Sequence, residues 1–196
     1  MKAAFVFAAI ATAMALCAAA QVGDTPATEP RHCVMSAGEQ AVVVAYFNTP
    51  TFSKHLLGFP HVATTLADTT QPTATGLDLN FVNLQLSVTG DAIPGDARSD
   101  FNRKARESCG VGPLAGLRNV HVVSIPANGS SPVFHRRYGK NGLLVRVSRV
   151  GFNRASTIAV MHVSYYAEHS GGGCLYVFER KAGRWVMKTE FRTWTT

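Results

Sequence analysis

The sequence predicts an α+β fold in which N-terminal helices pack on a C-terminal antiparallel meander sheet. Three observations support this class: a helix-capping pattern at residues 36–39, a second helical segment at 96–107, and β-branched and aromatic runs after residue 120. The chain has 196 residues, of which 46% are hydrophobic and 16% charged; this suits one folded domain and excludes wholesale disorder. We expect that domain to span residues 36–196.

The first helix is predicted from its capping residues. The Ser36 hydroxyl can accept a hydrogen bond from the Glu39 amide, while the Glu39 carboxylate reaches back to the start of the helix. Apolar residues continue to Phe47, and the Thr49-Pro50 pair ends the helix near Asn48. We therefore expect a largely buried helix over this segment.

A second helix is predicted over residues 96–107. Asp96 is placed to cap it, apolar side chains recur at four-residue spacing through Phe101, and Gly110 follows its end. The stretch 79–88 fits neither the helical nor the strand period, so we leave it unassigned.

The rest of the chain is predicted to form strands. The last two are joined across Arg180–Arg184, where Gly183 can supply the positive φ of a hairpin turn. Gly171–Gly173 are expected at a flexible hairpin tip. The predicted strands cover residues 62–66, 120–124, 143–150, 157–166, 175–179 and 185–191.

The N-terminus has the pattern of an export signal. Lys2 precedes an almost wholly apolar segment, and Ala18–Ala20 are the small residues that a signal peptidase accepts. The segment is shorter and richer in alanine than a membrane anchor. We expect residues 1–20 to be removed, residues 21–35 to form a polar leader, and the mature protein to be periplasmic or secreted without a transmembrane anchor.

Three cysteines remain after such cleavage, and an oxidising compartment favours one disulfide. Cys33 and Cys109 each flank the end of a predicted helix, whereas Cys174 lies in a distant predicted hairpin. We therefore expect Cys33–Cys109, and three buried free thiols are the alternative.

Charge is divided unevenly along the chain. Residues 21–97 hold two basic and seven acidic side chains, whereas residues 98–196 hold sixteen basic and five acidic ones. Arginine suits bidentate capture of carboxylate or phosphate, so a basic face can bind an anionic partner. The alternative is that these side chains cover the sheet and pair with the acidic half. The candidate ligand-binding residues are His135, Arg136, Arg137, Arg146, Ser148, Arg149 and Asn153.

The C-terminal half resembles a widespread family of exported bacterial proteins. The resemblance is carried by Val147–Asn153 (Val-Ser-Arg-Val-Gly-Phe-Asn), Leu175–Phe178, Lys181–Val186 and Trp194, and it covers about the last 65 residues well. A Gly-Arg-Trp-Val strand also occurs in many cystatin-like and related sheet folds, so a cystatin-like sheet is one form that the predicted fold can take. The resemblance implies export, and it brings no activity with it.

The run from Ser148 to Asn153 allows two interpretations. In the first, Arg149 reaches into a cleft and the run is a polar binding cluster held by a turn. In the second, Gly151 makes a bulge or turn, the neighbouring phenylalanine packs in the core, and Arg149 pairs with a carboxylate such as Asp100.

Two classes of function stay open. The first is an exported, non-catalytic binding or interaction protein, whose Arg-rich face takes an anionic glycan, a lipid head group or an acidic protein surface. The alternative is a cell-envelope hydrolase without a recognisable motif, or a secreted effector or immunity-type protein. The sequence holds no HExxH spacing, nucleophile elbow or phosphate loop. We therefore name no catalytic residue, metal or cofactor, and we expect no specific nucleic-acid partner.

Overall fold

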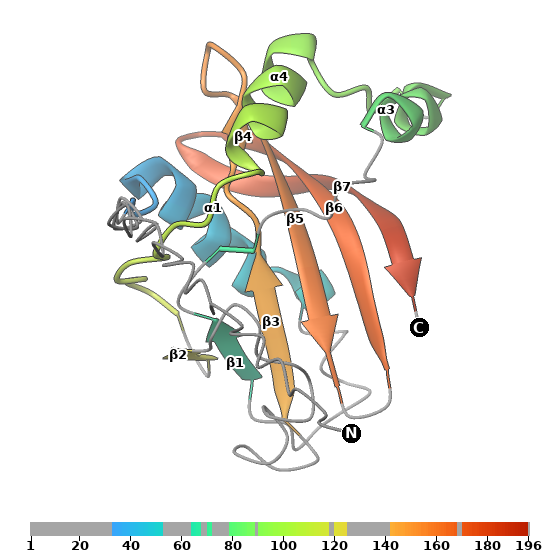
Figure 1. Ribbon diagram of the computed structural model, residues 1–196. Coiled ribbons are helices and arrows are strands. Elements are labelled where there is room, and N and C mark those ends of the chain that lie inside the picture. The colour runs from blue at the N-terminus through green and yellow to red at the C-terminus, as the bar shows by residue number, and fades with distance from the viewer. Residues whose placement is uncertain are drawn as a thin grey trace, which may run out of the picture. The chain divides into compact units, whose positions relative to one another are not determined.

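Helices and one mixed β-sheet make up the structure, which confirms the predicted α+β class (Figure 1). The computed structural model describes residues 33–52, 64–67, 70–71, 79–88, 90–117, 120–124, 142–167 and 170–195, all within the unit His32–Thr196. Within these ranges no helix is long and apolar enough to cross a membrane.

Seven strands form the sheet, in the order β2-β1-β3-β5-β6-β7, and β4 pairs with β5 off this path. The neighbours β3, β5, β6 and β7 are antiparallel and make up the expected meander. The sheet continues beyond the meander, because β1 runs parallel to both β2 and β3. The strands are β1 (Thr64–Ala67), β2 (Val120–Val123), β3 (Leu143–Val147), β4 (Gly151–Phe152), β5 (Ile158–Tyr166), β6 (Gly171–Lys181) and β7 (Arg184–Thr195).

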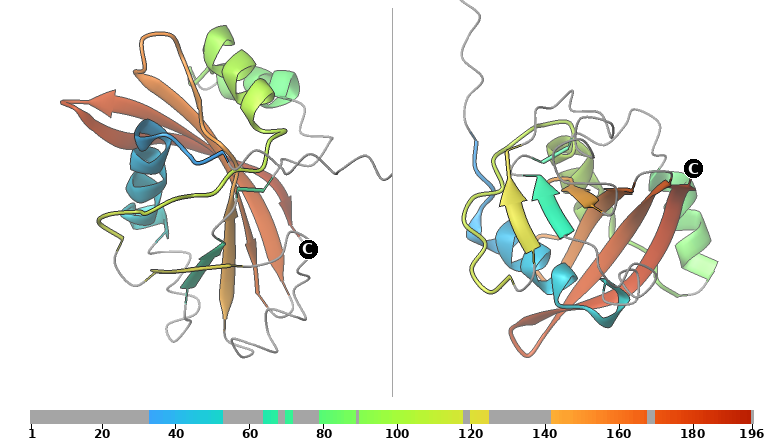
Figure 2. Two further views of the ribbon diagram at one scale, coloured as in Figure 1. Left: turned by 60° about the vertical axis from the view of Figure 1, so that its left-hand side comes forward. Right: turned by 90° about the horizontal axis from the view of Figure 1, so that it is seen from below.

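Helices cover both faces of the meander, as the left view of Figure 2 shows. Side chains alternate between the faces of a strand, so β5 and β6 contribute to two separate cores. Met161 and Tyr176 pack under α1 (Ala37–Phe47), whereas Val160 and Val177 pack under α3 (Leu79–Val88) and α4 (Gly95–Lys104).

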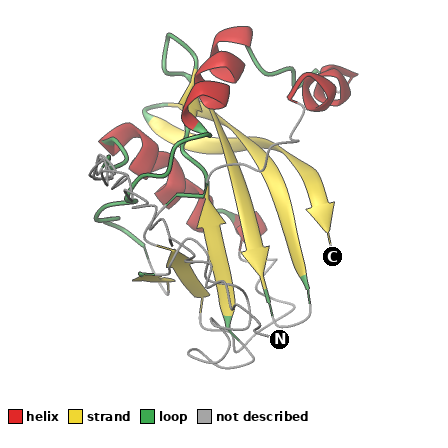
Figure 3. Cartoon of the chain, in the orientation of Figure 1, coloured by secondary structure: helices red, strands yellow, loops and turns green. Residues whose placement is uncertain are grey.

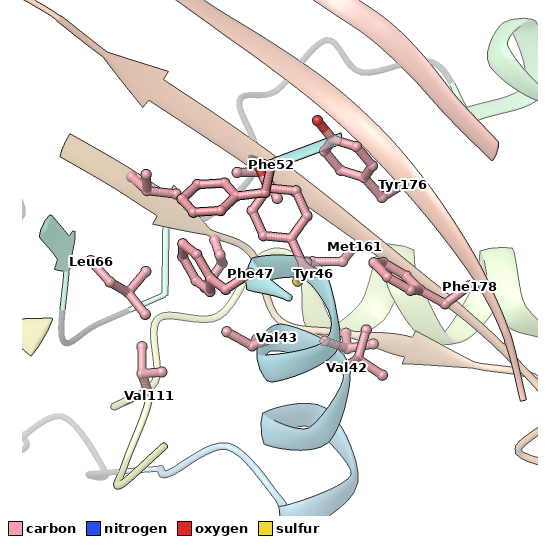
Figure 4. Packing of buried hydrophobic residues seen from close by; sticks show 14 of the residues in the cluster. Val42, Val43, Tyr46, Phe47, Phe52, Leu66, Val111, Met161, Tyr176 and Phe178 are labelled. Carbon is pink, nitrogen blue, oxygen red and sulfur yellow. The ribbon is translucent and has the colours of Figure 1, made fainter. Parts of the chain in front are cut away.

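The α1 core is the larger of the two and is rich in aromatic rings (Figure 4). Tyr46 lies with its ring centroid 4.9 Å from that of Tyr176 and 5.4 Å from that of Phe52. The capping box that the sequence predicts at Ser36 and Glu39 is present, so α1 begins where expected. The helix ends at Phe47, with Asn48 as its C-cap.

The segment that was left unassigned is helix α3. Leu79, Val82 and Leu86 are spaced three and four residues apart, which places them on one helical face against Val177. The pattern is short and has no recognisable cap, so periodicity alone did not distinguish helix from strand.

Helix α4 differs from the prediction at both ends. It begins at Gly95 after the N-cap Pro94 and ends at Lys104, with Ala105 as its C-cap, well before Gly110. Asp96 does not cap it from the N-cap position. The Asp96 carboxylate instead accepts hydrogen bonds from the backbone amides of Ala97 and Arg154 at 2.9 Å each, which attaches α4 to the loop after β4.

The prediction of a flexible tip at Gly171–Gly173 is wrong, because all three glycines lie buried inside β6. Aromatic rings occupy the space that their side chains would fill. A Cβ at Gly172 would lie within 3.0 Å of the Tyr165 ring, and one at Gly173 would lie 2.6 Å from the Trp194 Cδ1. The hairpin turn between β6 and β7 is confirmed: Ala182 and Gly183 have φ of 48° and 79°.

The Cys33–Cys109 disulfide is confirmed, with its Cα atoms 4.8 Å apart and a sequence separation of 76 residues. Val34 pairs with Gly110 beside it, so the segment before α1 is held to the segment after α4. Closing a loop of this length stabilises a fold by about 4 to 5 kcal/mol on the chain-entropy model. Cys174 is a buried free thiol.

We expect Gly151→Ala to lower the free energy of unfolding by about 1–3 kcal/mol, the usual effect of overpacking. A Cβ at Gly151 would lie 2.5 Å from the Phe101 Cα, where only movement of α4 can make room. Urea denaturation measures the change. Gly95→Ala is the control, because its added Cβ meets nothing closer than an Arg98 side-chain nitrogen at 3.8 Å. Equal effects of the two substitutions would contradict the packing argument.

Candidate functional site

The run Ser148–Asn153 contacts helices on both faces of the sheet, and its arginine has different partners from the one expected. Arg149 makes two hydrogen bonds to Glu39, from Nε at 3.1 Å and from Nη2 at 3.2 Å. Its Nη1 donates to Glu107. Carboxylates do hold the guanidinium, as the second interpretation required, but they are Glu39 and Glu107 and not Asp100, which that interpretation gave as an example.

Glu39 is fully buried, and every neighbour in its network favours its charged form. Its carboxylate accepts hydrogen bonds from the Ser36 amide at 2.9 Å, the Ser36 hydroxyl at 3.0 Å and the Val150 amide at 3.3 Å. Burial raises the pKa of the Glu39 carboxyl, but the bonds from Arg149 and Ser36 outweigh it and hold that pKa below its ordinary value. The predicted capping residue is thus also one end of a buried ion pair.

Asp100 ties the second half of the run to α4. It accepts from the Phe152 amide at 2.9 Å and from Lys104 Nζ at 2.8 Å. Asn153 holds the following turn, because its side-chain oxygen accepts from the Thr157 and Ile158 amides at 2.8 and 2.9 Å. These contacts place Arg149 and Asn153 in the internal framework of the fold.

The described members of the candidate ligand-binding set lie mostly inside the fold. Arg146 is only 6% exposed and Ser148 2% exposed, on the sheet face opposite α1. Arg149 is bonded to two carboxylates. His135, Arg136 and Arg137 lie outside the described residues, so their part in the prediction stays open.

His162 is buried on the same sheet face as Arg146. Its Nε2 lies 3.0 Å from the Thr193 hydroxyl, and its amide donates to the Ser148 hydroxyl at 3.0 Å. Burial lowers the pKa of His162 to about 4, so the ring is uncharged at neutral pH. An imidazole with so low a pKa is a weak general base, so the contact between the His162 ring and the Thr193 hydroxyl does not by itself indicate a catalytic dyad.

One group of metal-ligand atoms occurs in the described ranges, formed by Cys33, Glu107 and Cys109 within 4.8 Å of one another. The two sulfurs are joined as a disulfide and Glu107 accepts from Arg149. Neither thiolate is therefore free to bind a metal while the disulfide is intact.

A groove of about 810 Å³ lies between α1 and the start of β7. Its apolar lining comes from the outer side of α1 and from the strand opposite, and no acidic side chain is among its described lining residues. The left view of Figure 2 shows the β6–β7 hairpin projecting beside α1. The lining residues are Ala41, Val44, Ala45, Asn48, Thr49, Pro50, Thr51, Gly183, Arg184, Trp185, Val186 and Met187.

Basic side chains gather at the hairpin end of the groove. Arg180, Lys181 and Arg184 are exposed within five residues of one another. Arg180 lies 5.9 Å from the Trp185 ring centroid, and Lys181 pairs with Glu179 at 3.0 Å. In the described ranges no carboxylate pairs with Arg184. The sequence predicts this turn, but the groove beside it was not predicted. The signal that could have indicated a binding site is the group of three basic residues next to Trp185.

No protein-family model, curated protein or solved structure matches the chain. The resemblance to a family of exported proteins and the cystatin-like arrangement therefore stay predictions. The function has to be argued from the groove and the hairpin themselves.

Glu39→Gln is expected to lower the free energy of unfolding at pH 7 by about 3 kcal/mol, because it removes the buried carboxylate that is the main charge partner of the half-buried Arg149. The lowered pKa means that the native state keeps this stabilisation above pH 4.5 and loses it as the pH falls through the lowered value. Denaturant titrations from pH 7 to pH 3 should therefore show the variant and the parent converging in acid. Glu179→Gln, at a solvent-exposed pair, is the control, and a loss as large there would refute the assignment.

His162 should make the protein sensitive to acid at a higher pH than Glu39 does. As the pH falls from 6.5 to 4 the unfolded chain binds a proton that the buried ring does not, so stability falls by about 3 kcal/mol. We expect His162→Gln to lack this part of the decline, and the same substitution at the exposed His121 to keep it. If the stability of both variants fell equally between pH 6.5 and pH 4, His162 would be excluded as the cause of the acid sensitivity.

Proposed function

We propose that the protein is an exported, non-catalytic binding protein that takes an acidic segment of another protein in the groove between α1 and β7. One observation carries the proposal: an apolar groove is bordered by basic side chains, and its described lining contains no acid. An apolar floor holds side chains by burial, and a cationic border selects partners by sign of charge.

The lining favours a protein over the other anionic partners. An acidic glycan could stack the C–H face of a sugar ring on Trp185, but it has no aliphatic side chains to fill the groove between Val44 and Met187. Anionic membranes are bound by clusters of about four to eight basic residues, whereas the hairpin end has three with Glu179 among them. A protein segment supplies both acidic and apolar side chains.

Arg184, which pairs with no carboxylate in the described ranges, is the residue whose substitution tests the proposal most sharply. The probe is a synthetic peptide of about ten residues, the length of a strand, in which glutamate and valine alternate. We expect Arg184→Glu to weaken its binding about tenfold at low salt, because attraction at the groove becomes repulsion, and less at about 0.15 M salt. Isothermal titration calorimetry measures both.

Arg106→Glu is the matched control, since it makes the same charge change at an exposed residue outside the groove. Its binding should equal that of the parent after correction for net charge. Equal losses in the two variants, or no binding of the peptide by the parent, would overturn the proposal. So would binding of heparin or anionic vesicles in place of the peptide.

A further inference from the structure

The edge of the sheet runs alongside the groove. Strand β7 is the last in the strand order, and within the described ranges it pairs only with β6 (Figure 3). Edge strands present backbone groups that another chain can pair with. The segment Arg184–Met187 combines such an edge with the groove lining.

The direction of the backbone groups follows from the neighbouring strand. The Arg180 amide donates to the Thr157 carbonyl at 2.7 Å, on the β5 side, so it points away from β7. Arg180 is the register partner of Trp185, and Met187 is the partner of Phe178. In an antiparallel ladder, two directly opposite residues either bond to each other through their backbone groups or both direct those groups away from each other. Trp185 and Met187 belong to pairs of the second kind. The amide and carbonyl groups of Trp185 and Met187 are therefore directed away from β6, to the edge of β7 that pairs with no other described strand.

The side chains of the same two residues line the groove and pack against the α1 core. In an added antiparallel strand, residues that exchange backbone bonds with Trp185 and Met187 would have side chains on the same face. That face is the one bordered by Val44 and Ala45 of α1. Every second side chain of the added strand would thus enter the groove, and the others would lie among the exposed side chains of β7.

Charge distinguishes between possible added strands. Arg184 and Lys188 lie on either side of the Trp185–Met187 segment, and Arg180 and Lys181 lie across the hairpin. Lys188 also pairs with Asp91 at 3.3 Å, so Arg184 is the basic residue of this edge with no carboxylate partner in the described ranges. A second copy of β7 would bring these cations against one another, which is unfavourable for directly opposed strands. Acidic residues alternating with apolar ones satisfy both the cations and the groove.

From these observations we propose that the partner binds by strand addition: an extended acidic segment pairs antiparallel with the Arg184–Met187 edge and inserts alternate apolar side chains into the groove. This inference rests on the proposed function and adds the backbone pairing to it. It requires that the partner's apolar residues, and not its acidic ones, direct their amides toward β7.

Two N-methylated forms of the alternating glutamate–valine peptide test that requirement on the unmodified protein. Methylation of the valine amides removes the donors that face β7 and adds bulk at the junction, and should weaken binding at least about tenfold. Methylation of the glutamate amides, which face away, should change binding less than about threefold. Both peptides keep the same side chains and net charge.

The outcomes separate the two proposals. Unchanged binding of the valine-methylated peptide would overturn strand addition and leave the proposed groove function standing. Stronger weakening by methylation of the glutamate amides would contradict the antiparallel pairing. Failure of the unmethylated peptide to bind would overturn both.

Discussion

The ion pair between Arg149 and Glu39 fixes how α1 meets the sheet. A buried pair is stable only where its remaining hydrogen-bonding groups are satisfied. Here the carboxylate also accepts from Ser36 and Val150, and the guanidinium also donates to Glu107. Three parts of the chain therefore meet at this pair of side chains: the cap of α1, the connection between β3 and β4, and the segment after α4. The Cys33–Cys109 disulfide joins the segment before α1 to the segment after α4 close by.

The groove depends on this junction, because α1 forms one of its walls. Its other wall is connected to the same framework: the Trp185 ring lies 5.6 Å from that of Phe152, whose amide donates to Asp100 of α4. Both walls are thus positioned by the run after β3, whose side chains mostly face inward. The most distinctive motif of the sequence builds the site without lining it.

Features set by local contacts could be predicted from the sequence, whereas most features set by distant contacts could not, the Cys33–Cys109 disulfide being the exception. The capping box at Ser36 and the hairpin turn at Gly183 need only neighbouring residues, and both are confirmed. The partner of Arg149 lies 110 residues away, so charge counting suggested an exposed basic face where the structure has a buried pair. Gly173 suggested a loop because nothing local shows that Trp194 covers it. The groove was missed because its two walls are far apart in the chain.

A double-mutant cycle tests the central role of the Arg149–Glu39 pair most directly. Glu39→Gln, Arg149→Met and the combined variant are compared by urea denaturation at pH 7. The structure predicts a coupling energy of about 2 to 3 kcal/mol, since each single variant leaves a buried polar group without its partner and the double variant removes both charges. Additive losses, with a coupling energy below about 0.5 kcal/mol, would show that the two side chains stabilise the fold independently and would contradict this role.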